Sequence, residues 1–263
     1  MTEPKLRSDE RVAAEMKKRP LFFDIETAAH PRVKEWIVKE KPDLASVKAP
    51  GNYKDLKKIK TYIQKAQENL IIESQAAYIN KIAKAPLDAD YGVIRAIGYR
   101  EGVEGKICVM IVPKDIDAFL PPETFGKDHL VRTAVFDTEG DMLSRWWLLF
   151  KNARRQTVGY NSIGFDFPYL LRRSMDLRVK PSLQPDLRRY QYKGNMDLMA
   201  IMFNWGRAKG MKFVCKRYGI ENPNPELDGS QVANMDDATL VQYAAGDIYM
   251  LTEIYRLMDG FYW

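Results

Sequence analysis

Two acidic residues stand at the end of a short apolar run near the start of the chain. The run Leu21-Phe22-Phe23 leads into Asp24 and Glu26, and consecutive large apolar residues predict a strand covered on both faces. Because side chains alternate along a strand, both carboxylates project from one face, about 7 Å apart along the backbone. Two carboxylates whose ends are about 4 Å apart repel each other by about 4 kcal/mol at a partly buried site. A proton, a basic partner or a divalent cation removes that repulsion. Two acids at such a position, taken alone, more often mark a strand that ends in solvent.

A third acid lies at a predicted junction between strand and helix. Asp166 belongs to the stretch GYNSIGFDFPYL, residues 159–170, which follows a short strand predicted at 157–160. A helix is predicted from about 168 to 174, because proline is favoured in the first helical turn. An aspartate at this place is commonly an N-cap, and for Asp166 alone that is the simpler interpretation.

The final helix, predicted at about 236–258, carries a tyrosine and an aspartate one turn apart. Tyr243 and Asp247 are at positions i and i+4, so they share one face of the helix. The pair alone is a weak signal. The order along the chain strengthens it, because an acid pair ends the first strand, an aspartate begins a mid-chain helix and Tyr-x3-Asp lies on the last helix.

These three segments resemble the three motifs of the DEDD superfamily of 3′–5′ exonucleases, which have an RNase H-like fold. Residues 24–27, DIET, match the first motif, and residues 159–170 resemble the second motif as it stands in family B DNA polymerases. YAAGD, residues 243–247, matches the third motif in its tyrosine form, since the histidine form places His where this chain has Gln242. The resemblance implies the tyrosine (DEDDy) subclass and points to stand-alone phage or bacterial exonucleases related to the polymerase proofreading domain.

The resemblance also implies a metal site with two divalent cations, Mg²⁺ or Mn²⁺, held by Asp24, Glu26, Asp166 and Asp247. Asp24 would bridge the two ions, with Glu26 and Asp247 on one and Asp166 reaching the other. Carboxylate ligation suits these hard ions, and two of them activate water and stabilise the attacking and leaving oxygens. Tyr243 would orient the attacking water rather than act as a strong base, because the pKa of a phenol is near 10.

The predicted contacts to the substrate extend beyond the acids and the tyrosine. They are Thr27, Asn161, Phe165, Lys193, Arg207 and Lys212. A core position is the alternative for Phe165, and a solvated face is the alternative for the basic residues. Asp197 resembles a further aspartate of the family and is interpreted as structural support rather than as a ligand.

The charge of the chain is unevenly distributed. The net charge is +6, but residues 151–220 carry 15 Lys and Arg against 4 Asp and Glu, whereas residues 221–263 carry one Arg against 8 acids. The basic segment also contains Tyr190, Tyr192 and Trp205, a combination that suits a phosphate backbone and stacked bases. A solvated basic face explains the same composition equally well.

The pattern of apolar residues predicts an α/β fold with a mixed sheet flanked by helices. The first strand is expected at 20–26, and strands at 91–100, 106–112 and 131–136 are expected to form a meander. Helices are expected at about 196–205 and 210–218. We expect a charged arm at 1–19 and a single RNase H-like domain at 20–263, with an insertion at about 54–85 that is one long helix or a helical hairpin.

Composition excludes several classes of protein. An apolar fraction of 46% with 29% charged residues is typical of a soluble globular chain, and the apolar runs are far too short to span a membrane. The first 20 residues lack the apolar core of a secretory signal, and the two cysteines are expected as buried free thiols. The sequence therefore predicts a cytoplasmic protein that does not bind membranes.

The leading functional hypothesis is a metal-dependent 3′–5′ exodeoxyribonuclease that acts on a single-stranded or frayed 3′ end. An RNase D-like enzyme with the same chemistry on RNA is one alternative, because the four acids do not read the 2′-hydroxyl. A nucleic-acid-binding module with a silent nuclease site is another, although a degraded site usually loses an acid. An RNase H or resolvase type of endonuclease gives Tyr243 no function. A role in proofreading, replication or repair would need a polymerase partner.

Overall fold

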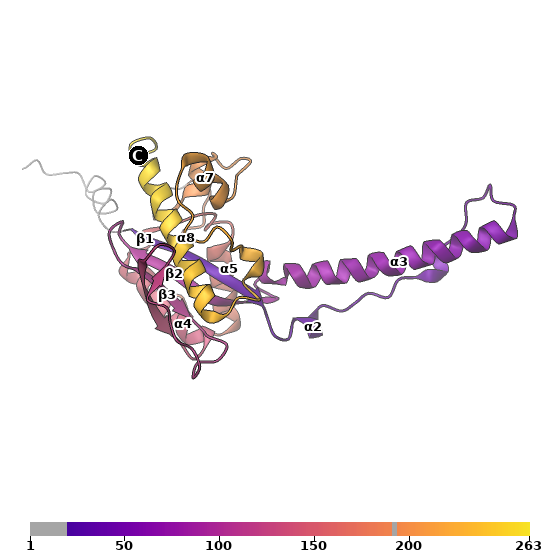
Figure 1. Cartoon of the computed structure of the whole chain (residues 1–263), viewed down its shortest axis with the longest axis horizontal. Helices are drawn as coiled ribbons and strands as arrows, with labels where there is room; N and C mark the ends of the chain where they lie inside the picture. Colours follow the sequence, from indigo (N-terminus) through magenta and orange to yellow (C-terminus); the bar gives the residue numbers. More distant parts are fainter. Residues whose placement is uncertain (1–19, 191–193) are drawn as a thin grey trace, which may run out of the picture. The chain divides into compact units, whose positions relative to one another are not determined.

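The computed structural model describes residues 20–190 and 194–263 (Figure 1), so the predicted arm at 1–19 and Lys193 lie outside the described residues. In this part of the chain one seven-stranded sheet has the order β4-β5-β3-β2-β1-β6-β7. The strands are β1 Leu21–Ala29, β2 Gly92–Glu101, β3 Ile107–Ile111, β4 Thr124–Phe125, β5 His129–Val135, β6 Thr157–Gly159 and β7 Asn195–Asp197. Both parallel and antiparallel pairs occur, which confirms the predicted α/β fold with a mixed sheet.

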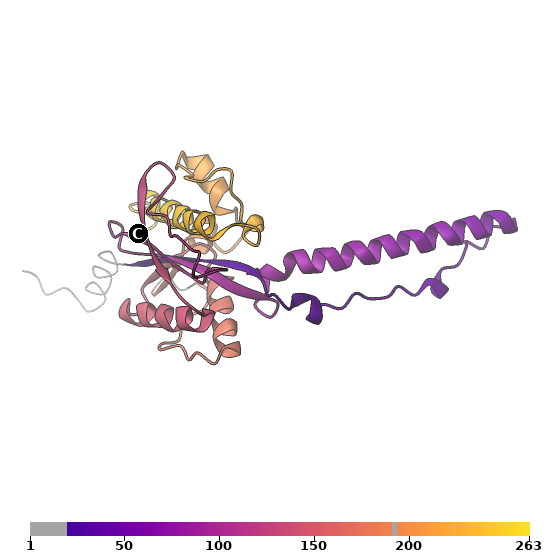
Figure 2. The ribbon, with the colours of Figure 1, turned by 60° about the horizontal axis from the view of Figure 1, so that its bottom comes forward.

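Helices cover both faces of this sheet. They are α4 Glu139–Asn152, α5 Asp166–Asp176, α6 Leu198–Met202, α7 Met211–Tyr218 and α8 Asp237–Met258. Figure 2 shows α8, in yellow, on one face and α4 and α5, in pink to salmon, on the other. The guanidinium of Arg173 on α5 forms two hydrogen bonds of 2.9 and 2.7 Å to the carboxylate of Glu139 on α4. Because Glu139 also accepts the backbone N–H of Ile94, α4 and α5 are fixed to β2.

The side chains of β1 alternate between the two faces of the sheet. Phe22 packs edge-on against Tyr255 of α8, with ring centroids 5.2 Å apart. Phe23 points the other way, where its ring lies 4.7 Å from that of Trp146 on α4 and 4.9 Å from that of Phe167 on α5. Both phenylalanines are fully buried, so β1 is the strand covered on both faces that its sequence predicts.

The prediction that residues 131–136 complete a meander is wrong. Strand β5 pairs with β3 in parallel, with Val131 opposite Ile107 and Val135 opposite Ile111. Antiparallel neighbours need only a short turn, whereas parallel neighbours need a connection long enough to return to the starting end. Residues 112–128, which include β4, provide that return.

Two other predicted boundaries also differ from the structure. Instead of one helix at 196–205, the chain forms β7 and then α6, because Asn195–Asp197 pairs in parallel with β6. A strand of three residues is too short to show an alternating pattern. The first strand continues to Ala29 rather than ending at 26, and just beyond it the backbone N–H of His30 donates to the carbonyl of Tyr91 at 2.8 Å.

The described chain divides into two compact units. Residues 20–28 with Val93–Trp263 form one, which we call the sheet unit, and Ala29–Gly92 form the other, which we call the helical unit. The predicted division into an arm at 1–19 and a single domain at 20–263 stays a prediction. The insertion expected at about 54–85 is one long helix rather than a hairpin, α3 Leu56–Lys84.

The helical unit has a small core. The short helix α2, Val33–Trp36, packs near the end of α3, where Val33, Ile37 and Ala85 are buried. An extended segment follows α2 and runs along α3 (Figure 1). It is held by polar contacts, such as those from the side chain of Ser74 to the carbonyl of Glu40 at 2.8 Å and from Gln67 to the carbonyl of Leu44 at 2.9 Å. No side chain within α3 itself is buried.

Among the described residues, no helix is both long enough and apolar enough to cross a membrane. Cys108 and Cys215 are free thiols; Cys215 is buried and Cys108 is half-buried, so the expectation of two buried thiols holds for Cys215 only.

The burial pattern predicts unequal protection of the two longest helices against hydrogen exchange. Amides of residues 56–70 in α3 should exchange at least about 100-fold faster than those in the middle of α8, because exposed helices open locally whereas buried ones open only with the whole unit. Deuterium exchange read out by mass spectrometry measures both helices in one experiment, with α4 as a second buried reference. Equal protection of α3 and α8 would contradict this prediction.

Candidate active site

Three of the predicted acids converge in the structure. Asp24, Glu26 and Asp247 each offer a carboxylate oxygen, and these oxygens all lie within 4.8 Å of one another. Glu26 and Asp247 are buried and Asp24 is half-buried. By the alternation of β1, Asp24 and Glu26 share the face of Phe22, which is the face that α8 covers. The acid pair on the strand therefore meets the aspartate on the last helix.

A close approach of α8 to the sheet makes this meeting possible. At Gly98 of β2, an added Cβ would lie 2.7 Å from the side chain of Ile248 and 3.0 Å from the carbonyl oxygen of Ala244. A larger residue would push the helix away from the sheet. A second glycine, Gly246, lies directly before Asp247, and a Cβ there would lie 2.4 Å from the side-chain nitrogen of Asn224.

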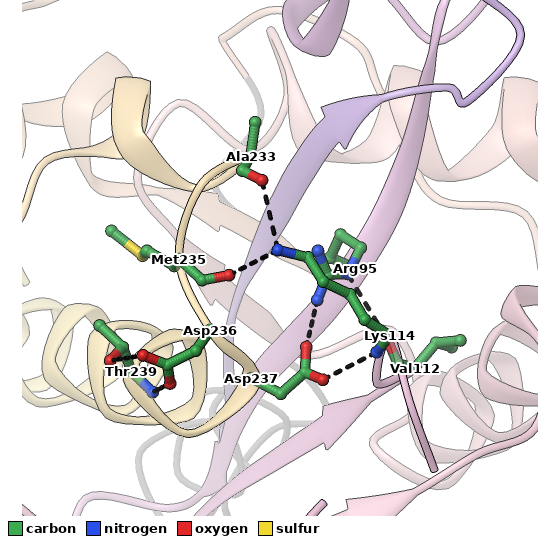
Figure 3. A network of polar contacts seen from close by, with 8 residues as sticks. All are labelled: Arg95, Val112, Lys114, Ala233, Met235, Asp236, Asp237 and Thr239. Atoms are coloured by element: carbon green, nitrogen blue, oxygen red, sulfur yellow. Dashed lines mark hydrogen bonds and ion pairs between the residues drawn. The ribbon is translucent and has the colours of Figure 1, made fainter. Parts of the chain in front are cut away.

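The start of α8 is fixed by a network of polar contacts (Figure 3). Asp237 forms an ion pair with Arg95 of β2 and accepts the backbone N–H of Lys114 at 2.8 Å. The ammonium of Lys114 in turn donates to the carbonyl of Met235 at 2.8 Å. Asp236 caps the helix by accepting the N–H of Thr239 at 2.8 Å, as Asp and Asn commonly do at a helix start. These contacts set where α8 begins, and thereby where Tyr243 lies.

The fourth acid, Asp166, is positioned by a backbone group of β1. Strand β6 pairs with β1 only at Leu21 and Phe22, so the N–H of Ile25 lies beyond the end of that ladder. The carboxylate of Asp166 accepts this N–H at 3.1 Å. Helix α5 begins at Asp166 with Phe165 as its N-cap residue, so the N-cap interpretation of Asp166 is wrong. The contact places Asp166 between Asp24 and Glu26 along the strand.

Asp197 has the supporting role that its sequence suggests. One of its oxygens accepts the N–H of Asn161 at 2.9 Å and that of Ala200 at 3.2 Å, and the other accepts the N–H of Ile163 at 3.0 Å. It therefore caps α6 and holds the loop between β6 and α5. Asp197 does not belong to the group of three acids that converge.

Burial perturbs all four acids, and repulsion from the other acids of the cluster adds to it for Asp24 and Glu26. Burial, followed by the charges of Asp166, Glu26 and Asp247, raises the pKa of Asp24 well above its ordinary value. Burial and the charges of Asp247 and Asp166 do the same to the pKa of Glu26. Burial raises the pKa of Asp166 and that of Asp247 to about 7. Such a group of carboxylates is stable in its charged form only with a counter-charge.

The residues present fit a divalent metal site. One carboxylate oxygen of Glu26, Oε1, is buried and has no hydrogen-bond partner among the described residues, which is costly for a polar atom unless a ligand satisfies it. The donor set consists of carboxylate oxygens, which Mg²⁺ and Mn²⁺ prefer over nitrogen or sulfur. The charge, the burial and the unpartnered oxygen therefore agree with the predicted cofactor.

Tyr243 lies beside Asp247 at the edge of this cluster. Burial, followed by the negative charges of Asp247, Glu26 and Asp24, raises the pKa of Tyr243 far above its ordinary value, so the phenol stays protonated. Its hydroxyl forms a hydrogen bond with the Asp247 carboxylate, and the ammonium of Lys212 lies 5.0 Å from the centre of its ring. Lys212 also lowers the pKa of Asp247. A protonated phenol is suited to orient a water molecule but not to deprotonate it.

The other predicted substrate contacts differ in their distance from this site. Lys212 lies against Tyr243, as described. Asn161 has a positive φ of 65° in the loop that Asp197 holds, and Phe165 is half-buried against Tyr169, with ring centroids 5.4 Å apart. Arg207 is exposed. Thr27 is buried and points to the face opposite Glu26 by the alternation of β1. Their roles stay predictions.

Some residues that build the site were not predicted from the sequence. Gly98 and Arg95 lie in an apolar strand and carry no motif, and their partners are about 140–150 positions away along the chain. Gly246 belongs to the segment YAAGD. A glycine within a predicted helix indicates close packing, so the sequence does carry a signal for this residue. The partners of these residues depend on which helix crosses which strand.

Comparisons with known proteins find a related domain and a similar fold. Residues 105–210 match the family model described as DNA polymerase family B, exonuclease domain, a range that contains Asp166 and Asp197. The family B DNA polymerase from the hyperthermophilic archaeon Pyrobaculum calidifontis has a similar structure, with a TM-score of 0.50 and 16% sequence identity. The similarity covers 92% of this chain and 24% of that polymerase chain. A search of curated protein sequences finds no match.

The matched fold and sequence together define the class. They confirm the RNase H-like fold and the predicted resemblance to the 3′–5′ exonuclease domain of family B DNA polymerases. The chain spans about a quarter of the polymerase that it resembles.

The crowded acids predict that removing one charge stabilises the metal-free protein. Asp24→Asn should raise the melting temperature in EDTA at pH 7.5 by about 2–4 °C, the shift that about 1 kcal/mol produces in a domain of this size. Because the folded-state pKa values are raised, stability of the wild type in EDTA should fall as pH rises from about 4 to about 7. Mg²⁺ or Mn²⁺ should restore stability to the wild type and much less to the variant.

Thermal unfolding followed by circular dichroism measures both effects. Asp117→Asn, the same substitution at an exposed position, serves as the matched control and should change neither the metal-free melting temperature nor the response to metal. A variant Asp24→Asn that is less stable than the wild type in EDTA would show that the acids do not repel as described.

Proposed function

We propose that this chain is a metal-dependent 3′–5′ exodeoxyribonuclease that removes mononucleotides from a single-stranded or frayed 3′ end. One observation carries the proposal: Asp24, Glu26 and Asp247 have carboxylate oxygens within 4.8 Å of one another. Asp166 is held beside the same strand and Tyr243 beside Asp247. The match to the exonuclease domain of family B DNA polymerases supports the direction of hydrolysis.

Asp24, Glu26, Asp166 and Asp247 would hold two divalent ions. When bound, these ions lower the pKa of a water molecule and neutralise charge on the attacking and leaving oxygens of the phosphodiester. The chain itself supplies rigidity, because β1, the start of α5 and the middle of α8 fix the ligands independently. An anionic substrate would be repelled by the same acids without a counter-charge.

Tyr243 would position the attacking water through its hydroxyl. The phenol is held protonated by burial and by its acidic neighbours, so it is a hydrogen-bond donor at neutral pH. Lys212 keeps a positive charge over the tyrosine ring and close to Asp247, where it would also attract a phosphate. The positions of Asn161 and Phe165 beside α5 are compatible with contacts to the terminal nucleotide.

DNA is the proposed substrate because both comparisons lead to DNA polymerases. RNA is the second candidate, since no residue of the acid cluster discriminates against a 2′-hydroxyl. The alternative of a silent binding module is disfavoured by the complete set of acids and by the unpartnered oxygen of Glu26. A role in proofreading beside a polymerase partner, in the cytoplasm, completes the proposal.

Substitutions in the cluster should separate metal binding from water positioning. Asp24→Ala should lower the hydrolysis rate of a 5′-labelled single-stranded oligodeoxynucleotide at least about 1,000-fold, because one of the acids that would hold the metal ions is lost. Tyr243→Phe should lower the rate about 100-fold and leave the metal-induced rise in melting temperature unchanged, since positioning groups contribute about 10²–10⁴. Tyr249→Phe, on the same helix, is the matched control.

Product length on a denaturing gel measures these rates and reports the direction of digestion. Hydrolysis by the Asp24→Ala variant at the rate of the wild type would contradict the proposal. Loss of the metal response in Tyr243→Phe would show that the tyrosine supports the ligands rather than the water.

DNA and RNA oligonucleotides of the same sequence should decide which polymer is the substrate. We expect a DNA oligonucleotide of about 20 residues to be degraded at least about 10-fold faster than RNA of the same sequence, because the second motif resembles that of DNA polymerases. Hydrolysis at equal metal concentration, measured as kcat/KM, gives the ratio. Faster degradation of RNA would assign the chain to the RNase D-like alternative.

A further inference from the structure

The N-terminal end of α3 and the segment that precedes it carry a dense group of lysines. They are Lys48, Lys54, Lys57, Lys58, Lys60 and Lys65, and we call them the lysine patch. All six side chains are exposed. Residues 48–65 contain a single acid, Asp55, whose carboxylate accepts the backbone N–H groups of Lys57 and Lys58 as the N-cap of α3. Within the described chain none of the six forms an ion pair.

Three lysines of the patch share one side of α3. Lys57, Lys58 and Lys65 lie within about 100° of one another around the helix axis, and Tyr62 follows Lys58 by one turn. The opposite side of α3, with Ile59 and Ile63, is partly covered by the extended segment that precedes the helix. From Lys57 to Lys65 the helix rises by about 12 Å, so the patch is an elongated strip rather than a point.

The position of these lysines is unfavourable for the helix itself. The N-terminal end of a helix carries the positive end of its dipole, which favours acids in the first turn and disfavours cations. The first turn of α3 contains no acid, and Lys57 and Lys58 stand there with Lys60 directly behind. Asp55 is the one acid among residues 48–65 that offsets these charges, so an anionic partner would relieve the remaining repulsion.

Aromatic side chains accompany the lysines. Tyr53 and Tyr62 pack edge to face, with ring centroids 5.6 Å apart, and each remains 38% exposed. Cations beside exposed aromatic rings are the combination that tracks a nucleic-acid backbone and stacks on bases. An acidic protein surface would be attracted by the lysines but would gain less from the exposed ring pair.

We propose that the lysine patch is a second nucleic-acid contact, which binds the phosphate backbone of the polymer. The identity of the polymer rests on the proposed function, whereas the polyanion chemistry rests on the patch alone. The helical unit is then a substrate-binding arm whose contacts are independent of sequence. Such contacts release counterions and make the affinity strongly dependent on salt.

A charge-removal variant tests this proposal in the full chain. Lys57, Lys58, Lys60 and Lys65 are changed to Gln together, and binding of a fluorescent DNA duplex with a single-stranded 3′ tail is followed by anisotropy in EDTA, where no hydrolysis occurs. The control changes four exposed lysines outside the patch, Lys34, Lys41, Lys84 and Lys106, and has the same net charge. We expect the patch variant to bind about 10-fold or more weakly at low salt and the control to bind like the wild type.

The salt dependence gives the more specific readout. The slope of log affinity against log salt should decrease in magnitude by about 2–4, because each phosphate contact contributes about 0.7–0.9. The melting temperature of the patch variant should not fall, since removing cations from a helix start does not destabilise it. An unchanged affinity and slope would overturn the proposal and leave an acidic protein as the occupant of the patch. Because the assay needs no metal and no hydrolysis, its failure is distinct from that of the proposed exonuclease activity.

Discussion

The crowding of four carboxylates, three of them buried and Asp24 half-buried, is the constraint on which the sheet unit depends. Burial disfavours each charge and raises all four pKa values, and the neighbouring acids of the cluster raise those of Asp24 and Glu26 further. A flexible protein would let the groups move apart. Here they are held by three separate elements, and the apolar contacts of β1 with both layers of helices supply the stability that the cluster removes.

Each element that carries an acid is anchored by contacts that do not involve the acid cluster itself. The start of α8 is tied to β2 by Arg95 and Asp237, and α5 is tied to α4 by Arg173 and Glu139. Asp166 is the exception, because its own carboxylate accepts the N–H of Ile25. That contact lowers the pKa of Asp166, in opposition to its burial, and it fixes the distance between α5 and β1. The geometry of the site is therefore a property of the packed core.

The sequence predicts this site better than it predicts the fold around it. Apolar runs and helical spacing are local signals, and they correctly indicate β1, α3 and α8. The parallel pairing of β5 with β3 depends on the path of residues 112–128, and the pairing of β7 depends on where β6 lies; no local pattern records either. The acids could be found because their chemistry restricts them to Asp and Glu. The role of Gly98 could not, since it depends on Ala244 and Ile248 of a distant helix.

Two groups of like charges in this chain are unbalanced, and their physical settings indicate different partners. The acids are buried, close together and fixed by strands and helices, so they suit a small cation that needs short and rigid ligand distances. The lysines of the patch are exposed on flexible stems along about 12 Å of helix, so they suit an extended polyanion and require no fixed geometry. A nuclease that acts at one end of a long polymer needs both kinds of contact. In the proposed nuclease, the rigid acids would align the bond to be cleaved, and the lysines would bind the phosphate backbone of the same polymer.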